Sequence, residues 1–308
     1  MYMEQKVLII GSGPAGCTAA LYCARFGLEP LMFLGRQEGG QLSITTDVEN
    51  YPGFIDGVLG PDLMSNMIKQ AQRFGTKTIA RDIKKICVDK RPFAVIDDTD
   101  EKHSAQSIII TTGAQAKWLG LESEKRYLGF GVSSCATCDG FFFKDQDVIV
   151  VGGGNTAVEE ALYLNGLVRS VTLIHRRNTL RAEKIMQERL FREKKVRILW
   201  NSVLKEVIGD GKSVTGARIA DVTSGDEREI NVQGIFIAIG HSPNTSLVKG
   251  QINCDSEGYI LTKANSTQTN IPGVFAAGDV QDKIFRQAVT AAGTGCMAAI
   301  EAEKFLSS

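Results

Sequence analysis

The fold of this chain is decided by the stretch Lys6-Val7-Leu8-Ile9-Ile10-Gly11-Ser12-Gly13-Pro14-Ala15-Gly16. The mostly apolar residues 6–10 predict a buried strand, residues 17–25 a helix, and residues 31–34 a second strand. In the turn, the first glycine permits a tight bend, the second lets the backbone approach a pyrophosphate, and the third lets helix and strand pack closely. We therefore expect a dinucleotide whose phosphates lie at the helix N-terminus, where free N–H groups favour anions.

The end of the second strand lacks a feature common to such units. An acidic residue usually binds the ribose hydroxyls there, but this chain has Leu34-Gly35-Arg36. We expect Glu38, or backbone groups of Gly39, Gly40 and Gln41, to hold the ribose instead.

The same strand–turn–helix–strand unit recurs further along the chain. It has a strand at residues 147–151, the turn Gly152-Gly153-Gly154-Asn155-Thr156-Ala157, a helix to residue 164 and a strand at 170–174. Two such units predict two nucleotide-binding domains.

The second unit differs from the first in the residues that come after its second strand. His175, Arg176 and Arg177 lie directly beyond it, and Arg181 lies four residues beyond Arg177. A carboxylate there would select a free ribose 2′-hydroxyl, whereas arginines suit a 2′-phosphate, so the nucleotide is expected to be NADPH. Alternatively, these arginines belong to a charged helix face, since residues 176–197 contain nine Lys or Arg.

The C-terminal part resembles the first unit rather than the second. Residues 270–279 form a short apolar strand ending in Gly278-Asp279, and residues 286–303 predict a helix of small residues. Similar strands end near residues 113 and 240, where we expect the chain to cross between domains. The predicted fold is α/β, with two Rossmann-like, three-layer domains. One is discontinuous (1–115 and 245–308), and the other (116–244) is inserted into it.

Length and composition exclude several classes of protein. A chain of 308 residues suggests two domains, and equal numbers of basic and acidic residues (35 each) give no field that favours nucleic acid. No stretch approaches the roughly 20 apolar residues of a membrane span, and the N-terminus lacks a signal-peptide pattern. We expect a cytoplasmic protein that binds neither nucleic acid nor membrane.

A single Cys-x-x-Cys pair, Cys135 and Cys138, precedes the second glycine-rich turn. A closed zinc site needs four ligands, but the chain has no second such pair and no His-x₃₋₅-His element, so we expect no metal. In a reducing compartment, the pair is expected to be a redox dithiol in which one sulfur attacks and the other resolves the mixed disulfide. Asp139 could protonate a departing thiolate, or be a cap or surface group. The other five cysteines look structural.

In combination, these motifs closely resemble the bacterial low-molecular-weight thioredoxin reductase family. The resemblance spans nearly the whole chain, in order. It rests on residues 11–16, Gly-Gly-Gln-Leu at 39–42, Glu-Asn-Tyr-Pro-Gly at 49–53, Cys-Ala-Thr-Cys-Asp-Gly at 135–140, residues 152–157, His-Arg-Arg at 175–177 and Gly-Asp at 278–279.

The resemblance implies that the first nucleotide is FAD, that the protein is a homodimer, and that the acceptor is thioredoxin or a thioredoxin-like redoxin. It implies that Cys138 faces the flavin, Cys135 attacks thioredoxin and Asp139 donates a proton. The implied FAD residues are Gly11, Ser12, Gly13, Pro14, Ala15 and Gly16 at the pyrophosphate; Gly35, Arg36, Gln37, Glu38, Gly39, Gly40, Gln41, Leu42, Asn50 and Gly113 around the cradle; and Gly278, Asp279, Arg286, Gln287 and Ala288 at the ribityl and flavin end. The implied NADPH residues are Gly154, Asn155, Thr156, Ala157, His175, Arg176, Arg177 and Arg181.

Both the dithiol and the nicotinamide site fall on the inserted domain, and both cannot face one flavin surface at once. We therefore expect this domain to rotate about the connections near residues 115–117 and 240–243. Two other functions are considered: a flavin-dependent reductase of another acceptor (a peroxiredoxin partner, a small disulfide or ferredoxin), and a nucleotide-binding redox sensor. The cysteine pair counts against ferredoxin, and the intact cysteine, aspartate and arginine sets count against the sensor.

Overall fold

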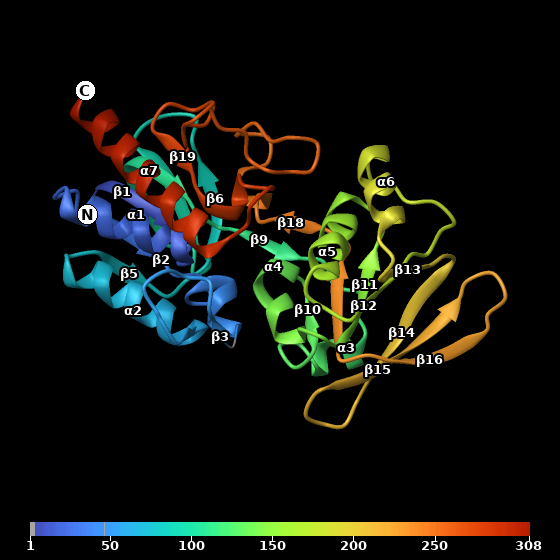
Figure 1. Cartoon of the computed structure of the whole chain (residues 1–308). Helices are drawn as coiled ribbons and strands as arrows, with labels where there is room; N and C mark the ends of the chain where they lie inside the picture. The colour runs from blue at the N-terminus through green and yellow to red at the C-terminus, as the bar shows by residue number, and fades with distance from the viewer. Residues whose placement is uncertain (1–3, 46) are drawn as a thin grey trace. The chain divides into compact units, whose positions relative to one another are not determined.

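The computed structural model describes residues 4–45 and 47–308 and forms two compact units, which are drawn in Figure 1. Unit 1 comprises Met1–Gln115 and Ser242–Ser308, and unit 2 comprises Ala116–His241. The second crossing thus lies at 241/242, whereas the sequence suggested 244/245. The predicted α/β class is confirmed, because each unit is built around its own largely parallel sheet.

Unit 1 contains a seven-stranded sheet in the order β5-β2-β1-β8-β7-β6, with β19 also paired to β8. The strands β5, β2, β1, β8 and β19 run parallel, whereas β6, β7 and β8 form antiparallel pairs. The central strand β1 is apolar on both faces, and its residues 7–10 are all buried. The bounds are β1 (Gln5–Ile10), β2 (Leu31–Phe33), β5 (Lys77–Ile79), β6 (Ile83–Cys87), β7 (Phe93–Asp97), β8 (Lys102–Ile110) and β19 (Val274–Ala276).

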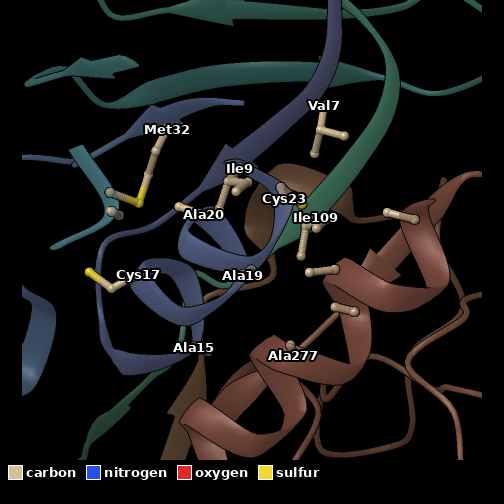
Figure 2. Packing of buried hydrophobic residues seen from close by; sticks show 14 of the residues in the cluster. Val7, Ile9, Ala15, Cys17, Ala19, Ala20, Cys23, Met32, Ile109 and Ala277 are labelled. Atoms are coloured by element: carbon tan, nitrogen blue, oxygen red, sulfur yellow. The ribbon is translucent and has the colours of Figure 1, made fainter. Parts of the chain in front are cut away.

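Three helices cover one face of this sheet: α1 (Pro14–Arg25), α2 (Gly60–Arg73) and α7 (Ala288–Ser307). Figure 2 shows how small side chains of α1, among them Ala19, Ala20 and Cys23, fill the space between the strands and α7. A Cβ on Gly295 of α7 would lie only 2.2 Å from the Ala15 carbonyl oxygen. The two helices can therefore approach this closely only because Gly295 has no side chain.

The opposite face of the sheet is covered by segments without long helices. Its core joins the outward side chains of β1, β2 and β8 to those of β6 and β7 and to Val248, Ile252 and Ile260. The unit's smaller elements include a short helix, η3 (Ser246–Val248), and a two-stranded sheet of β3 (Asp47–Val48) and β4 (Val58–Leu59).

Unit 2 has three layers. Its parallel sheet has the order β10-β17-β11-β12-β13, with bounds β10 (Val132–Ser133), β11 (Asp147–Gly152), β12 (Ser170–Ile174), β13 (Val196–Leu199) and β17 (Gly234–Ala238). One face packs against α4 (Ala136–Asp139), α5 (Asn155–Asn165) and α6 (Lys184–Arg192). The other packs against α3 (Glu122–Arg126) and an antiparallel sheet of β14 (Ser202–Gly209), β15 (Val214–Asp221) and β16 (Glu227–Asn231).

The two crossings of the chain lie side by side. Strands β9 (Ala114–Ala116) and β18 (His241–Pro243) pair as a two-stranded ribbon. The backbone hydrogen bonds Lys117 N to Gly240 O and Asn244 N to Gly113 O, both 2.9 Å, lie at its two ends. Unit 2 therefore begins and ends at the same place.

None of the helices within residues 4–45 and 47–308 has the length and apolar character required to cross a bilayer.

Candidate active site and nucleotide sites

The glycines of the first turn fall into two groups. A Cβ on Gly11 would lie 2.3 Å from the Thr111 carbonyl oxygen, and one on Gly16 would lie 2.0 Å from the Gly11 oxygen, so the protein itself requires both glycines. Gly13 has an ordinary φ of −66°, and a Cβ there would meet nothing within 4 Å. Among the residues that the structure describes, no contact explains Gly13, and the open space beside it lies at the N-terminus of α1, where free N–H groups would favour a ligand's phosphates.

The loop after β2 is held against this turn by Ser12. The buried Ser12 hydroxyl donates to Leu34 O (2.7 Å) and accepts from Gly39 N (2.9 Å). Gly40, which begins η1 (Gly40–Ile44), lies so close that a Cβ on it would be 3.4 Å from the Gly13 Cα. The structure thus brings residues 35–42 to residues 11–16, as a shared phosphate and ribose cradle would require.

A carboxylate that sequence analysis missed lies at the end of β2. The Asp82 carboxylate accepts from Arg36 N (2.9 Å) and pairs with Arg36 Nε (2.7 Å), and a Cβ on Gly35 would be 3.3 Å from it. Glu38, the expected replacement, is exposed, and Gln37 donates to Gly40 O within its own loop. Because Asp82 is 46 positions from Arg36, no local sequence signal could identify it.

The ribityl and flavin set comes together at the start of α7. Asn50 Nδ2 donates to Gln287 Oε1 (3.2 Å), and Gln287 forms a capping box with Thr290. Gly278 N donates to Thr294 Oγ1 (2.9 Å), and Ala288 is the first residue of α7. Gly113, expected around the cradle, lies between β8 and β9, and its carbonyl oxygen accepts from Asn244 N (2.9 Å).

Asp279 is the one perturbed acid in this region. It lies in η4 (Gly278–Val280), shortly after β19, and it is half-buried. Burial, and next the charge of Asp282, raise the pKa of its carboxyl from 3.8 to about 6, and Arg286 partly offsets this rise. A carboxylate here, with few groups to solvate it, can accept hydrogen bonds from ligand hydroxyls.

The glycines of the second turn fall into the same two groups: two that contacts within the protein require, and one that leaves open space. A Cβ on Gly152 would lie 2.3 Å from Ala238 O, and one on Gly153 would lie 2.2 Å from the His175 ring. Gly154, at the N-cap of α5, has a φ of −94° and nothing within 4 Å. Space for a ligand therefore opens at the N-terminus of α5 as it does at α1, while Ala157 packs beneath the turn.

Three predicted arginines lie in the segment after β12, which is joined to this turn by the hydrogen bond from Arg181 N to Gly153 O (2.7 Å). Arg176, Arg177 and Arg181 are exposed, and none takes part in an ion pair with any described residue. All three precede α6, which begins at Lys184, so they are not part of the charged helix face considered as the alternative. Asn155 Oδ1 accepts from Glu183 N (2.8 Å), which ties this loop to the first turn of α5.

Cys135 and Cys138 form a disulfide with Cα atoms 5.3 Å apart. Cys135 is the N-cap of α4, and its backbone N–H donates to Ser133 Oγ (3.0 Å). After the pair, a Cβ on Gly140 would lie 3.0 Å from Leu164 and 3.2 Å from Tyr163, both on α5. The segment that carries the disulfide is thus packed, through Ala136 and Gly140, against α5, the helix that follows the second glycine turn.

Asp139 adjoins the disulfide and is partly buried. Burial raises the pKa of its carboxyl, and a hydrogen bond from Ser133 partly offsets the rise. A carboxyl with a raised pKa keeps its proton at higher pH than an exposed one, as a proton donor must.

Among residues 4–45 and 47–308, one group of side chains could hold a metal ion: Asp97, Glu101 and His103. Arg81 Nη1 already lies 2.8 Å from Asp97 and 2.7 Å from Glu101, and His103 Nε2 lies 3.2 Å from Asp97. The arginine supplies the positive charge that a metal would bring, and neither cysteine of the disulfide belongs to this group.

Known proteins match this chain along nearly its whole length. The family model described as pyridine nucleotide-disulphide oxidoreductase matches residues 5–295. A thioredoxin reductase of Rickettsia conorii is 58% identical over 308 residues, covering 99% of both chains. The solved thioredoxin reductase from Giardia duodenalis superposes with a TM-score of 0.96 at 40% identity, covering 99% of this chain and 100% of that one. The solved thioredoxin reductase from Streptococcus pyogenes MGAS5005 superposes with a TM-score of 0.95 at 42% identity, covering 100% of this chain and 99% of that one.

The chain belongs to the thioredoxin reductase family. It is an oxidoreductase of the pyridine nucleotide-disulphide type. The resemblance inferred from the motifs is confirmed, and so is the two-domain Rossmann-like fold that the thioredoxin reductase family shares.

Proposed function

We propose that this enzyme transfers electrons from NADPH, through FAD and the Cys135–Cys138 pair, to the disulfide of thioredoxin or a thioredoxin-like redoxin. The observation that carries the proposal is that the segment carrying the disulfide packs against α5, while the loop of three exposed arginines is hydrogen-bonded to the glycine turn that precedes this helix. A disulfide and a nucleotide site sharing one unit suit a reaction that moves electrons between nucleotide and sulfur.

The residues present fit both cofactors. The opening at Gly13, the loop held by Ser12 and the half-buried acid Asp279 suit the pyrophosphate, ribose and ribityl groups of FAD in unit 1. The opening at Gly154 and the exposed arginines suit the pyrophosphate and 2′-phosphate of NADPH in unit 2. When bound, these cofactors supply two electrons as a hydride equivalent.

The chain's own chemistry is thiol–disulfide exchange. Two electrons and two protons break the Cys135–Cys138 bond and give a dithiol. The Cys135 thiolate then attacks an acceptor sulfur, forming a mixed disulfide and releasing the acceptor's other sulfur as a thiol. The Cys138 thiolate attacks Cys135, which re-forms the enzyme disulfide and releases the reduced acceptor. Asp139 protonates the departing thiolate, since its raised pKa keeps a proton available.

The surface beside the disulfide suits a protein acceptor. Phe141 and Phe142, in η2 (Gly140–Phe143), are 61% and 45% exposed. Phe143 instead packs edge-on against Phe236, with ring centroids 5.4 Å apart, and anchors the segment. Two exposed aromatic rings fixed by a third make a rigid apolar contact area, which a small-molecule disulfide would not need.

The proposal includes rotation of unit 2 about the β9–β18 ribbon, because unit 2 carries both the disulfide and the NADPH arginines. A cross-link between the units that leaves turnover intact would contradict it.

We also propose that unit 1 forms a homodimer. The hydrogen bond between Asn50 and Gln287 joins the loop before α2 to the start of α7. Exposed apolar side chains lie on and near these two segments, within residues 44–55 and 284–297: Ile44, Ile55, Ile284, Phe285, Val289 and Met297. Light scattering that gives the mass of a single chain at micromolar concentration would contradict the homodimer.

The test is NADPH oxidation by the purified flavoprotein, with and without thioredoxin, for the wild type and matched variants. We expect the rate of NADPH oxidation to depend strongly on thioredoxin. This thioredoxin-dependent oxidation should be lost in Cys135→Ser and in Cys138→Ser. Asp139→Asn should slow turnover by about 10²-fold, the contribution typical of a positioned acid. Cys87→Ser, which changes a cysteine outside the disulfide, should be unaffected.

Each other outcome has a distinct meaning. Equally rapid turnover of a small chromogenic disulfide without thioredoxin would make the enzyme a small-disulfide reductase. Retained thioredoxin reduction in Cys138→Ser would remove the dithiol from the pathway. Failure to oxidise NADPH with every disulfide would overturn the nucleotide assignment and favour a redox sensor.

A further inference from the structure

His175 follows β12 directly but differs from the arginines that come after it, because its side chain is buried. The residue is only 5% exposed, whereas Arg176, Arg177 and Arg181 are exposed. A side chain this buried has little surface left to offer a nucleotide.

The ring is held between two segments of unit 2. On one side it lies against the second glycine turn, where a Cβ on Gly153 would be 2.2 Å from its Cε1 and Nδ1. On the other side, its Nε2 is 2.9 Å from the Thr179 carbonyl oxygen, to which the ring N–H donates. The edge of the ring also faces Trp200, with centroids 6.4 Å apart.

Backbone hydrogen bonds also hold the segment from His175 to Arg181 in place. Arg181 N donates to Gly153 O (2.7 Å), and His175 exchanges backbone hydrogen bonds with Leu199 and Ser202 (2.9 Å each). The segment from His175 to Arg181 is thus bonded at its start to Leu199 and Ser202 and at its end to Gly153 of the glycine turn, and the imidazole ring packs against the same glycine. Replacing the ring by a small side chain would leave the Thr179 carbonyl without its donor and Gly153 without its packing surface.

We propose that His175 is a positioning residue that selects the nucleotide. Its buried ring fixes the distance between the pyrophosphate turn at Gly152–Gly154 and the arginines at 176–181, so that both ends of a 2′-phosphorylated nucleotide are bound together. This inference rests on the proposed use of NADPH. It assigns His175 no contact with the nucleotide, although the motif alone placed it among the cofactor ligands.

Nucleotide fragments separate this role from catalysis. The adenosine 2′,5′-bisphosphate probe needs both the turn and the arginines, whereas adenosine 5′-monophosphate needs only the turn. Their dissociation constants would be measured by calorimetry on the FAD-loaded enzyme for wild type, His175→Ala and His175→Gln. Arg189→Ala, which removes an exposed cation from α6, is the matched control.

We expect the wild type and Arg189→Ala to prefer the 2′-phosphate. His175→Ala should lose about tenfold of that preference, as when one charge-assisted hydrogen bond is misplaced. Its affinity for the monophosphate should change far less. His175→Gln, whose amide can donate to Thr179, should recover part of the preference. Thermal unfolding would verify that each variant is folded, and the glutamine variant carries the test if the alanine variant is not.

Two results would overturn the proposal: an unchanged preference in both His175 variants, or an equal loss of affinity for the two fragments, which would limit the ring to shaping the turn. A wild-type enzyme without any preference for the 2′-phosphate would be a different failure. It would overturn the assignment of NADPH to unit 2, and this inference with it.

Discussion

At the scale of single residues, Asp279 links cofactor binding to pH. Its carboxyl has a pKa raised from 3.8 to about 6, chiefly by burial and next by Asp282. In the FAD-free protein, the folded state therefore keeps the Asp279 proton up to about pH 6, whereas the unfolded state releases it near pH 4. This proton binding stabilises the folded state fully below about pH 4, and the stabilisation is lost as pH rises through about 6. The free energy of unfolding should fall by about 3 kcal/mol over this range.

We accordingly expect Asp279→Asn to flatten the decline of unfolding free energy between pH 4 and pH 7. Urea denaturation of the FAD-free wild type and variant at several pH values would measure it. Asp56→Asn, which changes an exposed carboxyl in unit 1, should keep the wild-type slope. Parallel slopes for Asp279→Asn and wild type would contradict the assignment. With FAD bound, ribityl hydroxyls that donate to the carboxylate should make the wild-type slope shallower.

Residues also differ in how well the sequence predicts their place. The glycine turns could be located from spacing alone, because a strand, a bend and a helix follow one another within a few positions. Asp82 could not, since its pairing with Arg36 depends on β5 lying beside β2. The same holds for the bond between Asn50 and Gln287. Spacing reports local geometry, and these contacts are set by tertiary structure.

At the scale of elements, the contact between α1 and α7 makes a clear prediction. Gly295→Ala would place a Cβ 2.2 Å from the Ala15 carbonyl oxygen and push the two helices apart. We expect a loss of about 1–3 kcal/mol, typical of overpacking, and weaker FAD retention because Ala15 lies in the first glycine turn. Chemical denaturation and released flavin fluorescence would measure both effects.

Gly293→Ala is the matched control, because it lies in the same helix and a Cβ there would meet nothing within 4 Å. It should be neutral, or stabilising by about 1 kcal/mol through helix propensity. Similar destabilisation by both variants would show that the close approach at Gly295 has no special importance.

The bounds of some helices and strands could be predicted from the sequence because local residue preferences determine them. The strand at 170–174 was predicted at its observed bounds, Ser170–Ile174. Helix α1 begins at Pro14 rather than at residue 17, because proline is well suited to a first helical turn. The sheet β14-β15-β16 was not anticipated: its edge strand β16 is mostly charged and exposed, so its sequence lacks the apolar alternation of a half-buried strand.

At the scale of the whole molecule, unit 2 is self-contained. Both of its hydrophobic clusters are built from residues within 116–241, and the paired β9 and β18 bring its two ends together. We expect residues 116–241, expressed alone, to unfold cooperatively and to bind adenosine 2′,5′-bisphosphate. Unit 1, with residue 115 joined to 242 by a short Gly-Ser linker, should retain FAD.

A fragment that stops at residue 199 is the control for this experiment. It lacks β17, which lies between β10 and β11 in the sheet, and should not fold. An excised 116–241 that is unfolded or aggregated, as judged by circular dichroism, would show that unit 2 depends on unit 1 for its stability.

The pairing of β19 with β8 also has a consequence for the order in which a growing polypeptide acquires structure. Unit 1 cannot complete its sheet until Val274–Ala276 has been synthesised, nor fill its core until α7 has followed. Unit 2 is complete much earlier. Although β1 and α1 precede unit 2 along the chain, unit 1 matures after it, and these two elements must wait with apolar surface exposed. Chaperone demand during synthesis should therefore arise from the N-terminal segment rather than from the inserted one.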